Sequence, residues 1–158
     1  MRSPLLRRSL TAVVALLMTV VSLSPAAAAA ESAPAAGKGA CAAKAMDPHE
    51  SKGEGKKRNR KVILAKVSAM CRGTKGVSKL VIDAKLQKKS GRGWKNVTKN
   101  RSTPHPGIRM GKKYVGQTFD IKCQKGTFRV YFRVSGKVDG TMRYGNWGAG
   151  NPRKNPCG

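Results

Sequence analysis

The sequence predicts an all-β protein: a small antiparallel sandwich stapled by disulfides. Short segments with alternating apolar and polar residues follow one another from Val62 onward, and turns rich in Gly, Asn and Pro separate them. Four cysteines stand in what remains after an N-terminal targeting segment. No ten-residue stretch of that remainder has helical periodicity. Five to seven short strands with frequent turns favour an antiparallel sandwich or barrel.

The predicted strands each have one apolar face. Inward sets are expected at Ile63, Ala65, Val67, Ala69 and Cys71; at Leu80, Ile82, Ala84 and Leu86; at Val115, Phe119, Ile121 and Cys123; and at Phe128, Val130, Phe132 and Val134. A hairpin turn at residues 90–93 leads into Trp94, and residues 142–147 form a last short strand. The β-domain is therefore expected over residues 62–158.

The cysteines predict two disulfides. An even number of cysteines in a small exported chain is typical of a disulfide framework, and the sequence contains no closely spaced pair of the kind that structural zinc sites use. Three pairings are possible. Cys71 and Cys123 share the inward register of their strands, which favours a Cys71–Cys123 bridge and leaves Cys41–Cys157 to tie the N-terminal arm to the tail.

Residues 1–30 read as a signal peptide. Three arginines precede an apolar run from Leu10 to Leu23, and Ala28-Ala29-Ala30 offers a small-residue cleavage site before Glu31. The apolar run is shorter than the roughly 20 residues that span a bilayer. The segment predicts a secreted, extracellular protein of bacterial type, without a transmembrane anchor.

Residues 31–61 predict a flexible basic arm. The segment has almost no large apolar residues, so it cannot bury enough surface to offset its ordering entropy. It is either a solvated linker or a docking arm that becomes ordered on an acidic partner. Its candidate partner-binding residues are Lys52, Lys56, Lys57, Arg58, Arg60 and Lys61.

The charge of the chain makes an anionic partner the leading expectation. The formal net charge is +26, from 33 Lys and Arg against 7 Asp and Glu. A field of this sign attracts acidic proteins, cell-wall polymers and nucleic acids within about a Debye length. An acidic protein in a secreted complex is the preferred partner, with contact to a polyanion or the cell envelope as a further possibility.

Catalytic chemistry is poorly supported. The two histidines, His49 and His105, are expected to face solvent in the arm and in a loop between prolines. Asp83 and Asp120 fall on outward strand faces, where ion pairs explain them, and Asp139 is a turn residue. The sequence therefore predicts no enzyme activity, no metal and no cofactor.

Residues 125–132 partly match an RNA-recognition signature, but Thr127 and Arg129 stand where that signature has base-stacking aromatics. The sequence thus predicts no sequence-specific nucleic-acid binding. The same strand does place Arg129, Tyr131 and Arg133 on its outer face. Such a basic and aromatic stripe is a second candidate partner-binding surface.

These features resemble a group of small exported proteins. Leu86-Gln87 before a Gly turn and Trp94, Cys123, residues 126–130 and a cysteine near the end are similar to disulfide-bonded β-sandwich proteins of high-GC Gram-positive bacteria. The order Cys71, Trp94, Cys123 resembles the immunoglobulin-like sandwich. The layout of signal peptide, arm and β-domain is similar to the adaptor subunit of umbrella toxin particles.

That resemblance implies a non-enzymatic adaptor, with the arm entering a repeat ring of a large toxin chain and the β-domain holding a lectin-like subunit. A free cationic antimicrobial or polyanion-binding protein is the alternative. A secreted enzyme or protease inhibitor is the third class, and the scarcity of ionisable catalytic groups disfavours it.

Overall fold

The protein is built almost entirely from antiparallel β-strands. The computed structural model describes residues 39–73 and 76–158, so the predicted signal peptide and residues 31–38 of the predicted arm lie outside the described residues. The only helix in the described ranges is the six-residue α1 (Lys52–Lys57), and none there is long and apolar enough to cross a membrane. The all-β prediction is confirmed; the immunoglobulin-like topology stays a prediction.

The larger sheet forms around two long strands. β5 (Val77–Ser90) pairs with β10 (Thr127–Val138) from Val77 opposite Val138 to Lys88 opposite Phe128. The shorter strands β6 (Gly93–Asn96) and β7 (Arg101–Pro106) pair with β5. On the other side, β10 pairs with β11 (Thr141–Tyr144), β12 (Gly148–Ala149) and β13 (Arg153–Lys154).

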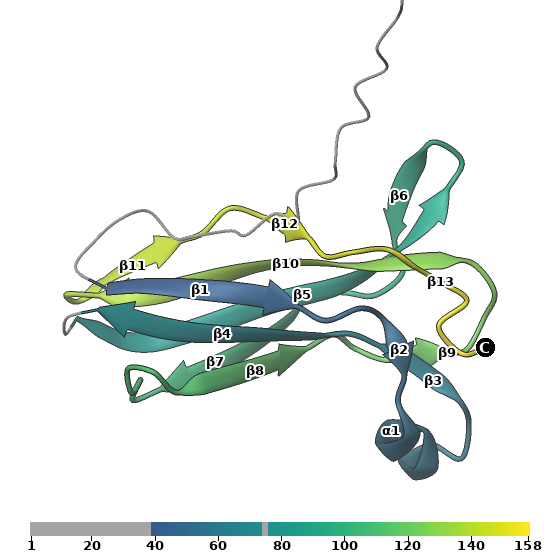
Figure 1. Cartoon of the computed structure of the whole chain (residues 1–158), viewed down its shortest axis with the longest axis horizontal. Helices are drawn as coiled ribbons and strands as arrows, with labels where there is room; N and C mark the ends of the chain where they lie inside the picture. Colours follow the sequence, from purple (N-terminus) through teal and green to yellow (C-terminus); the bar gives the residue numbers. More distant parts are fainter. Residues whose placement is uncertain (1–38, 74–75) are drawn as a thin grey trace, which may run out of the picture.

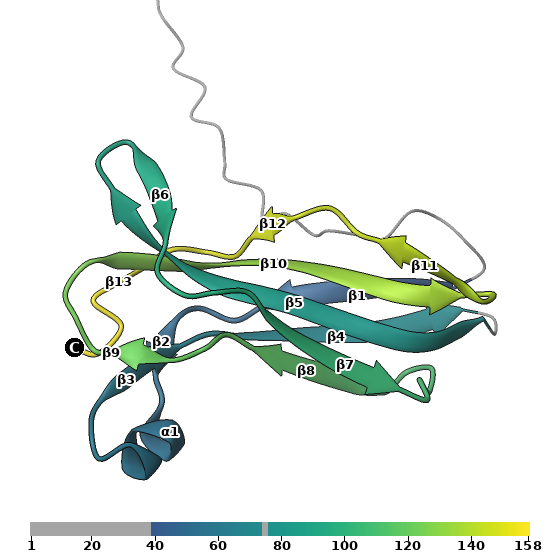
Figure 2. The same ribbon diagram turned by 180° about the vertical axis from the view of Figure 1, so that it is seen from behind.

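A second sheet lies over the first. It contains β1 (Gly39–Ala45), β4 (Lys66–Gly73) and β8 (Lys113–Gln117), with β4 in the middle. Figure 1 shows β1 and β4 in front of β5 and β10, and Figure 2 shows the larger sheet from its outer side. A small third sheet of β2 (His49–Glu50), β3 (Val62–Leu64) and β9 (Ile121–Lys122) closes one end.

The core lies between the larger sheet and the second sheet. Three of the four predicted inward sets are buried in it. Leu80, Ile82 and Leu86 of β5 are fully buried, as is Phe128 of β10. Apolar side chains every second residue drive this burial, since successive residues of a strand point to opposite faces. The remaining buried members are Ile63, Ala65, Val67, Ala69, Cys71, Ala84, Val130, Phe132 and Val134.

The inward register predicted around β8 is wrong. Val115 and Phe119 are 44% and 45% exposed, whereas Tyr114 is buried at 8%. Gly116 is the inward residue of β8, and a Cβ atom added there would meet Ile82 Cγ2 at 2.7 Å. The apolar character of Val115 misled the prediction, because the true inward position is occupied by a glycine that lets β8 approach β5.

The predicted disulfide pairing is also wrong. The bridges are Cys41–Cys71 and Cys123–Cys157, not Cys71–Cys123 and Cys41–Cys157. The cause is β1, which lies within the segment that was predicted to be a flexible arm. β1 pairs with β4 and places Cys41 directly opposite Cys71. The second bridge then joins the C-terminal tail to the residue that follows β9.

The described part of the predicted arm is folded onto the domain, so the predicted boundary at residue 61 is wrong there. β1 contributes Cys41 and Ala43 to the core, and β2 pairs with β3. Ser51 caps α1 by accepting a hydrogen bond from the Glu54 amide. Small alanine side chains bury little apolar area, but the pairing with β4 and the Cys41–Cys71 bridge compensate for it.

Candidate functional site: a cationic and aromatic face

The outer face of the larger sheet gathers the predicted stripe with residues from three other strands and from the loop after β11. Residues of β10 that alternate with the core set point outward, and the register places Arg129 opposite Gln87, Tyr131 opposite Lys85 and Arg133 opposite Asp83. We call the resulting surface the ladder face. Its members are Asp83, Lys85, Gln87, Lys89, Trp94, Arg129, Tyr131, Arg133, Tyr144 and Trp147.

Guanidinium groups lie against aromatic rings along the ladder face. Arg129 Cζ lies 4.3 Å from the ring centroid of Trp94 and 5.8 Å from that of Tyr131. The Tyr131 and Trp147 rings are stacked, with centroids 5.2 Å apart. Arg133 Cζ then lies 5.0 Å from the Trp147 centroid and 5.3 Å from the Tyr144 centroid. Each cation is held against the negative face of a ring, which fixes its position.

Two lysines extend this cationic array. Lys85 Nζ lies 4.7 Å from the Trp147 centroid and 5.4 Å from the Tyr131 centroid. Lys89 Nζ lies 5.5 Å from the centroid of Trp94, its partner across the β5–β6 hairpin. Both ammonium groups therefore stand beside the rings that Arg129 contacts.

Asp83 anchors the Arg133 end of the ladder face. Arg133 Nε donates to Asp83 Oδ2 at 2.8 Å, Asn100 Nδ2 donates to Oδ1 at 3.1 Å, and the Ser102 hydroxyl also donates to Oδ1. Burial alone would raise the pKa of the Asp83 carboxyl, but these hydrogen bonds and the Arg133 charge outweigh it and lower the pKa. Asp83 thus remains ionised, and both of its carboxylate oxygens accept hydrogen bonds from neighbouring side chains.

Arg129 is held differently. Its Nε donates to Gln87 Oε1 at 2.9 Å, and Gln87 Nε2 donates to Asn96 Oδ1 at 2.9 Å, which connects β10 through β5 to β6. Burial lowers the pKa of the Arg129 guanidinium, with Tyr131 opposing the change. Among the described residues no carboxylate lies within ion-pair distance of Arg129.

The basic residues of the predicted arm lie elsewhere. Lys52, Lys56 and Lys57 are on α1, and Arg58, Arg60 and Lys61 follow it; all six, which we call the basic cluster, are exposed. The helix and the β5–β6 hairpin project from opposite edges at the same end of the molecule (Figures 1 and 2). The structure therefore separates the two predicted partner-binding groups.

Half of the basic cluster is paired with acids. Arg58 Nε lies 2.7 Å from Asp120 Oδ2, Lys57 Nζ 3.2 Å from Glu54 Oε1, and Lys61 Nζ 3.7 Å from Glu50 Oε2. Within the described ranges, Lys52, Lys56 and Arg60 have no such pair. These three are the cations of the cluster that remain available to another molecule.

The histidines lie apart from the ladder face. His49 Nδ1 is 2.9 Å from the carbonyl oxygen of Asp47, and the His105 ring packs beside Tyr114 with centroids 5.2 Å apart. Asp120 is an ion-pair partner, and Asp139 occupies a turn with a φ of 47°. His105 differs from the prediction, because it lies on β7 rather than in a loop and is partly buried, and its Nε2 has no hydrogen-bond partner among the described residues. The absence of enzyme activity stays a prediction.

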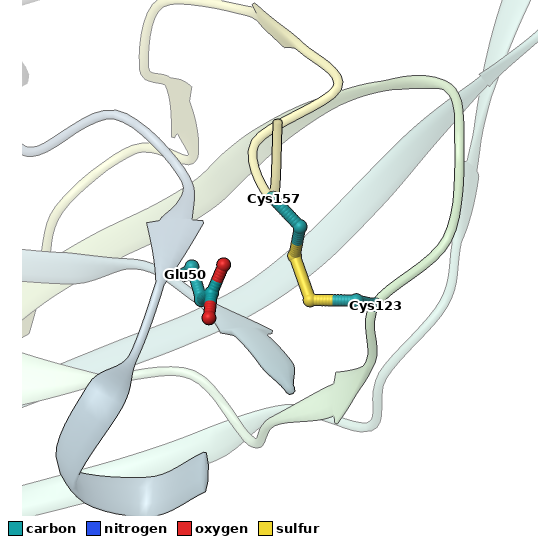
Figure 3. Close-up of side chains that lie close together, drawn as sticks. All are labelled: Glu50, Cys123 and Cys157. Carbon is teal, nitrogen blue, oxygen red and sulfur yellow. A yellow bond between two sulfur atoms is a disulfide. The ribbon is translucent and has the colours of Figure 1, made fainter. Parts of the chain in front are cut away.

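One group of potential metal ligands lies at the Cys123–Cys157 bridge. The carboxylate of Glu50 and the two sulfur atoms lie within 4.8 Å of one another, and Figure 3 shows the carboxylate beside the bridge. Because each sulfur is bonded to the other, neither is a thiolate that could bind a metal. Glu50 is also close to Lys61, so its charge is already balanced.

Sequence reasoning found Arg129, Tyr131 and Arg133 but missed their partners. Trp94, Tyr144 and Trp147 come from a hairpin and from the chain after β10, and only the folded sheet places them on one surface. The local signals were the outward positions of Asp83, Lys85 and Gln87, which alternate with the inward set of β5. No family model matches the chain, and neither a curated protein nor a solved structure shows significant similarity to it.

Proposed function

We propose that the protein is an exported, non-enzymatic adaptor that links acidic partners in an extracellular complex. The observation that carries the proposal is the large excess of cations over the acids available to them. In the described part of the chain, ion pairs engage Asp83, Asp120, Glu50 and Glu54 with one cation each. The remaining cations attract acidic partners, and the attraction weakens with salt.

Two separate cationic surfaces favour an adaptor over a simple binder. The basic cluster beside α1 and the ladder face lie on different elements, and α1 projects from the edge opposite β6 (Figure 1). A molecule that bridges two partners needs two surfaces that both remain accessible. The setting in a toxin-type complex rests on the resemblance in layout to umbrella toxin adaptors.

Export is part of the proposal. Two disulfides are typical of extracellular proteins, and residues 1–30 have the pattern of a signal peptide. A compartment that keeps the bridges oxidised would also keep β1 and the C-terminal tail attached to the sheets.

The proposal is tested by affinity capture from the culture supernatant, followed by isothermal titration of the captured protein at two salt concentrations. The bait is the wild type or a variant with Lys52, Lys56 and Arg60 replaced by Ser, three cations without an acidic pair in the described ranges. We expect one saturable stoichiometry, an affinity that falls steeply with salt, and loss of one partner by the variant.

A free polyanion- or envelope-binding antimicrobial is the second candidate. The β5–β6 hairpin favours it, because Lys88 and Lys95 face each other there and Lys89 and Arg92 lie close to the turn. Such a protein would bind DNA, anionic polymers and acidic proteins alike and would damage bacterial envelopes without a partner. Saturable binding to a single acidic protein contradicts this alternative.

A further inference from the structure

Each arginine of the ladder face lies against two aromatic rings, but among the described residues only Arg133 has a counter-ion. Arg133 donates through Nε to the buried carboxylate of Asp83. Arg129 donates through Nε to the neutral amide of Gln87 instead. In the part of the chain that the structure describes, Arg129 has no carboxylate partner. A half-buried guanidinium without a counter-ion is a position that an external anion would stabilise.

The neighbours of Arg129 add to the local positive charge. Lys85 stands beside Tyr131 and Lys89 beside Trp94, the two rings that Arg129 contacts. Neither lysine is ion-paired to a described acid. Three cations thus converge around two rings. The hydrogen bonds from Arg129 to Gln87 and from Gln87 to Asn96 hold the guanidinium before any ligand arrives.

The rings nearest Arg129 already contact cations or each other, and this limits the kind of ligand that Arg129 can bind. Trp94 is covered by Arg129 and Lys89, while Tyr131 and Trp147 stack on each other and carry Lys85. Nucleobases bind proteins of this kind largely by stacking on free ring faces. The ladder face offers the charged groups of arginine and lysine instead. The planar guanidinium group of an arginine can bind a carboxylate through two parallel hydrogen bonds.

We propose that Arg129, flanked by Lys85 and Lys89, is an anion site that receives an Asp or Glu side chain of the acidic protein partner. The two Nη atoms of Arg129 donate to the carboxylate, and the lysines add long-range attraction. This inference rests on the proposed function and assigns one surface and one residue to it.

The chain provides its own reporters for this site, because its only two tryptophans, Trp94 and Trp147, belong to the ladder face. The experiment titrates the ¹⁵N-labelled protein with decaglutamate, a ten-residue peptide of glutamates, and follows the two indole N–H signals. We expect the Trp94 signal to shift in a saturable manner. Saturable binding with both indole signals unchanged would overturn the site.

Three variants separate the site from net charge. Arg129→Gln removes the charge and the fork, Arg129→Lys keeps the charge and removes the fork, and Arg109→Gln removes a charge from an exposed arginine outside the ladder face. Hydrogen bonds to charged groups predict that Arg129→Gln weakens decaglutamate binding about tenfold or more. Arg129→Lys should also weaken it several-fold, while Arg109→Gln should have little effect.

The outcomes distinguish this inference from the proposed function. Equal, small losses for Arg129→Gln and Arg109→Gln would overturn the Arg129 site and leave binding to acidic partners intact. No binding of decaglutamate by the wild type even at low salt would overturn the proposed function itself. Tighter binding of a ten-nucleotide oligothymidylate, with the Trp94 signal shifted, would overturn the carboxylate assignment. If Arg129→Gln fails to fold, the Arg129 site is tested by decaglutamate binding to Lys85→Gln together with the indole shifts of the wild type. Unchanged binding by Lys85→Gln with no shift of the Trp94 signal would overturn the site.

Discussion

Asp83 is the residue that connects the ladder face to the stability of the sheet. Its side chain is 6% exposed and accepts hydrogen bonds from Arg133, Asn100 and Ser102. Its pKa is lowered in the folded protein, so the unfolded chain binds the proton more readily. The stabilisation by Asp83 is therefore complete above the unfolded pKa, about 3.9, and is lost as pH falls through the lower folded value.

We predict that Asp83→Asn lowers the free energy of unfolding at pH 7 by about 1–3 kcal/mol, because Arg133 loses its charged partner. Between about pH 5 and pH 2, the stability of the wild type should fall more steeply than that of the variant. Urea unfolding at several pH values measures both effects. Parallel curves for the two proteins would show that Asp83 does not titrate as the structure requires.

The residue scale also shows what the sequence can predict. The outward positions of Arg129, Tyr131 and Arg133 follow from strand alternation alone, and the structure confirms them. Their contacts with Trp94 and Trp147 do not, since these depend on the hairpin and on the path of the chain after β10. Nor does alternation reveal that Arg133 has a carboxylate partner, whereas no acid in the described ranges pairs with Arg129.

Among the strands, β8 has the most sensitive packing. Gly116 faces the core against Ile82, where an added Cβ would come within 2.8 Å of the Ile82 Cβ and 3.3 Å of Thr103 Oγ1. We predict that Gly116→Ala forces β8 away from β5 and costs about 1–3 kcal/mol of stability. Thermal unfolding measures the loss.

A second glycine provides the control for Gly116. Gly53 lies in α1, and a Cβ atom added there would meet no atom within 4 Å. Gly53→Ala should leave the melting temperature unchanged or raise it slightly, because alanine favours helix over glycine. Similar losses for the two substitutions would contradict the packing described for β8.

The two disulfides close loops of similar length, with sequence separations of 30 and 34 residues, so their effects on the unfolded chain are nearly equal. Their surroundings differ, because Cys41 and Cys71 are buried while Cys123 and Cys157 are partly exposed. We predict that replacing Cys41 and Cys71 with Ala lowers the melting temperature more than replacing Cys123 and Cys157. Equal losses would mean that burial of the first bridge adds nothing.

Among the elements, the sequence predicted the long strands β5 and β10 and the short strands β6 and β11, but it missed β1. The inward sets of β5 and β10 are dense in Leu, Ile, Val and Phe, and their alternation is unmistakable. β1 consists of small residues and one lysine, so its place in a sheet depends on pairing with β4 rather than on its own apolar area. The wrong cysteine pairing followed directly from missing β1.

The whole molecule combines a compact β-domain with a positive charge that its own acids do not neutralise. This net positive charge acts mainly on partners. It attracts anionic molecules and keeps the protein soluble, but it does not specify a particular fold. We predict that raising the salt concentration from about 0.05 M to 0.5 M weakens partner binding strongly, since the Debye length shortens over this range. The melting temperature should not fall in parallel, because apolar packing is not screened; a parallel fall would contradict the separation of binding from folding.

The central claim, that the protein is an adaptor for acidic partners, is tested most directly by titrating it with the acidic protein captured from the supernatant while excess double-stranded DNA is present. A specific adaptor should retain one saturable stoichiometry, with only a moderate loss of apparent affinity from competition. If DNA displaces the partner completely, or if binding never saturates at a fixed ratio, the protein is a nonspecific polycation and the adaptor function is wrong.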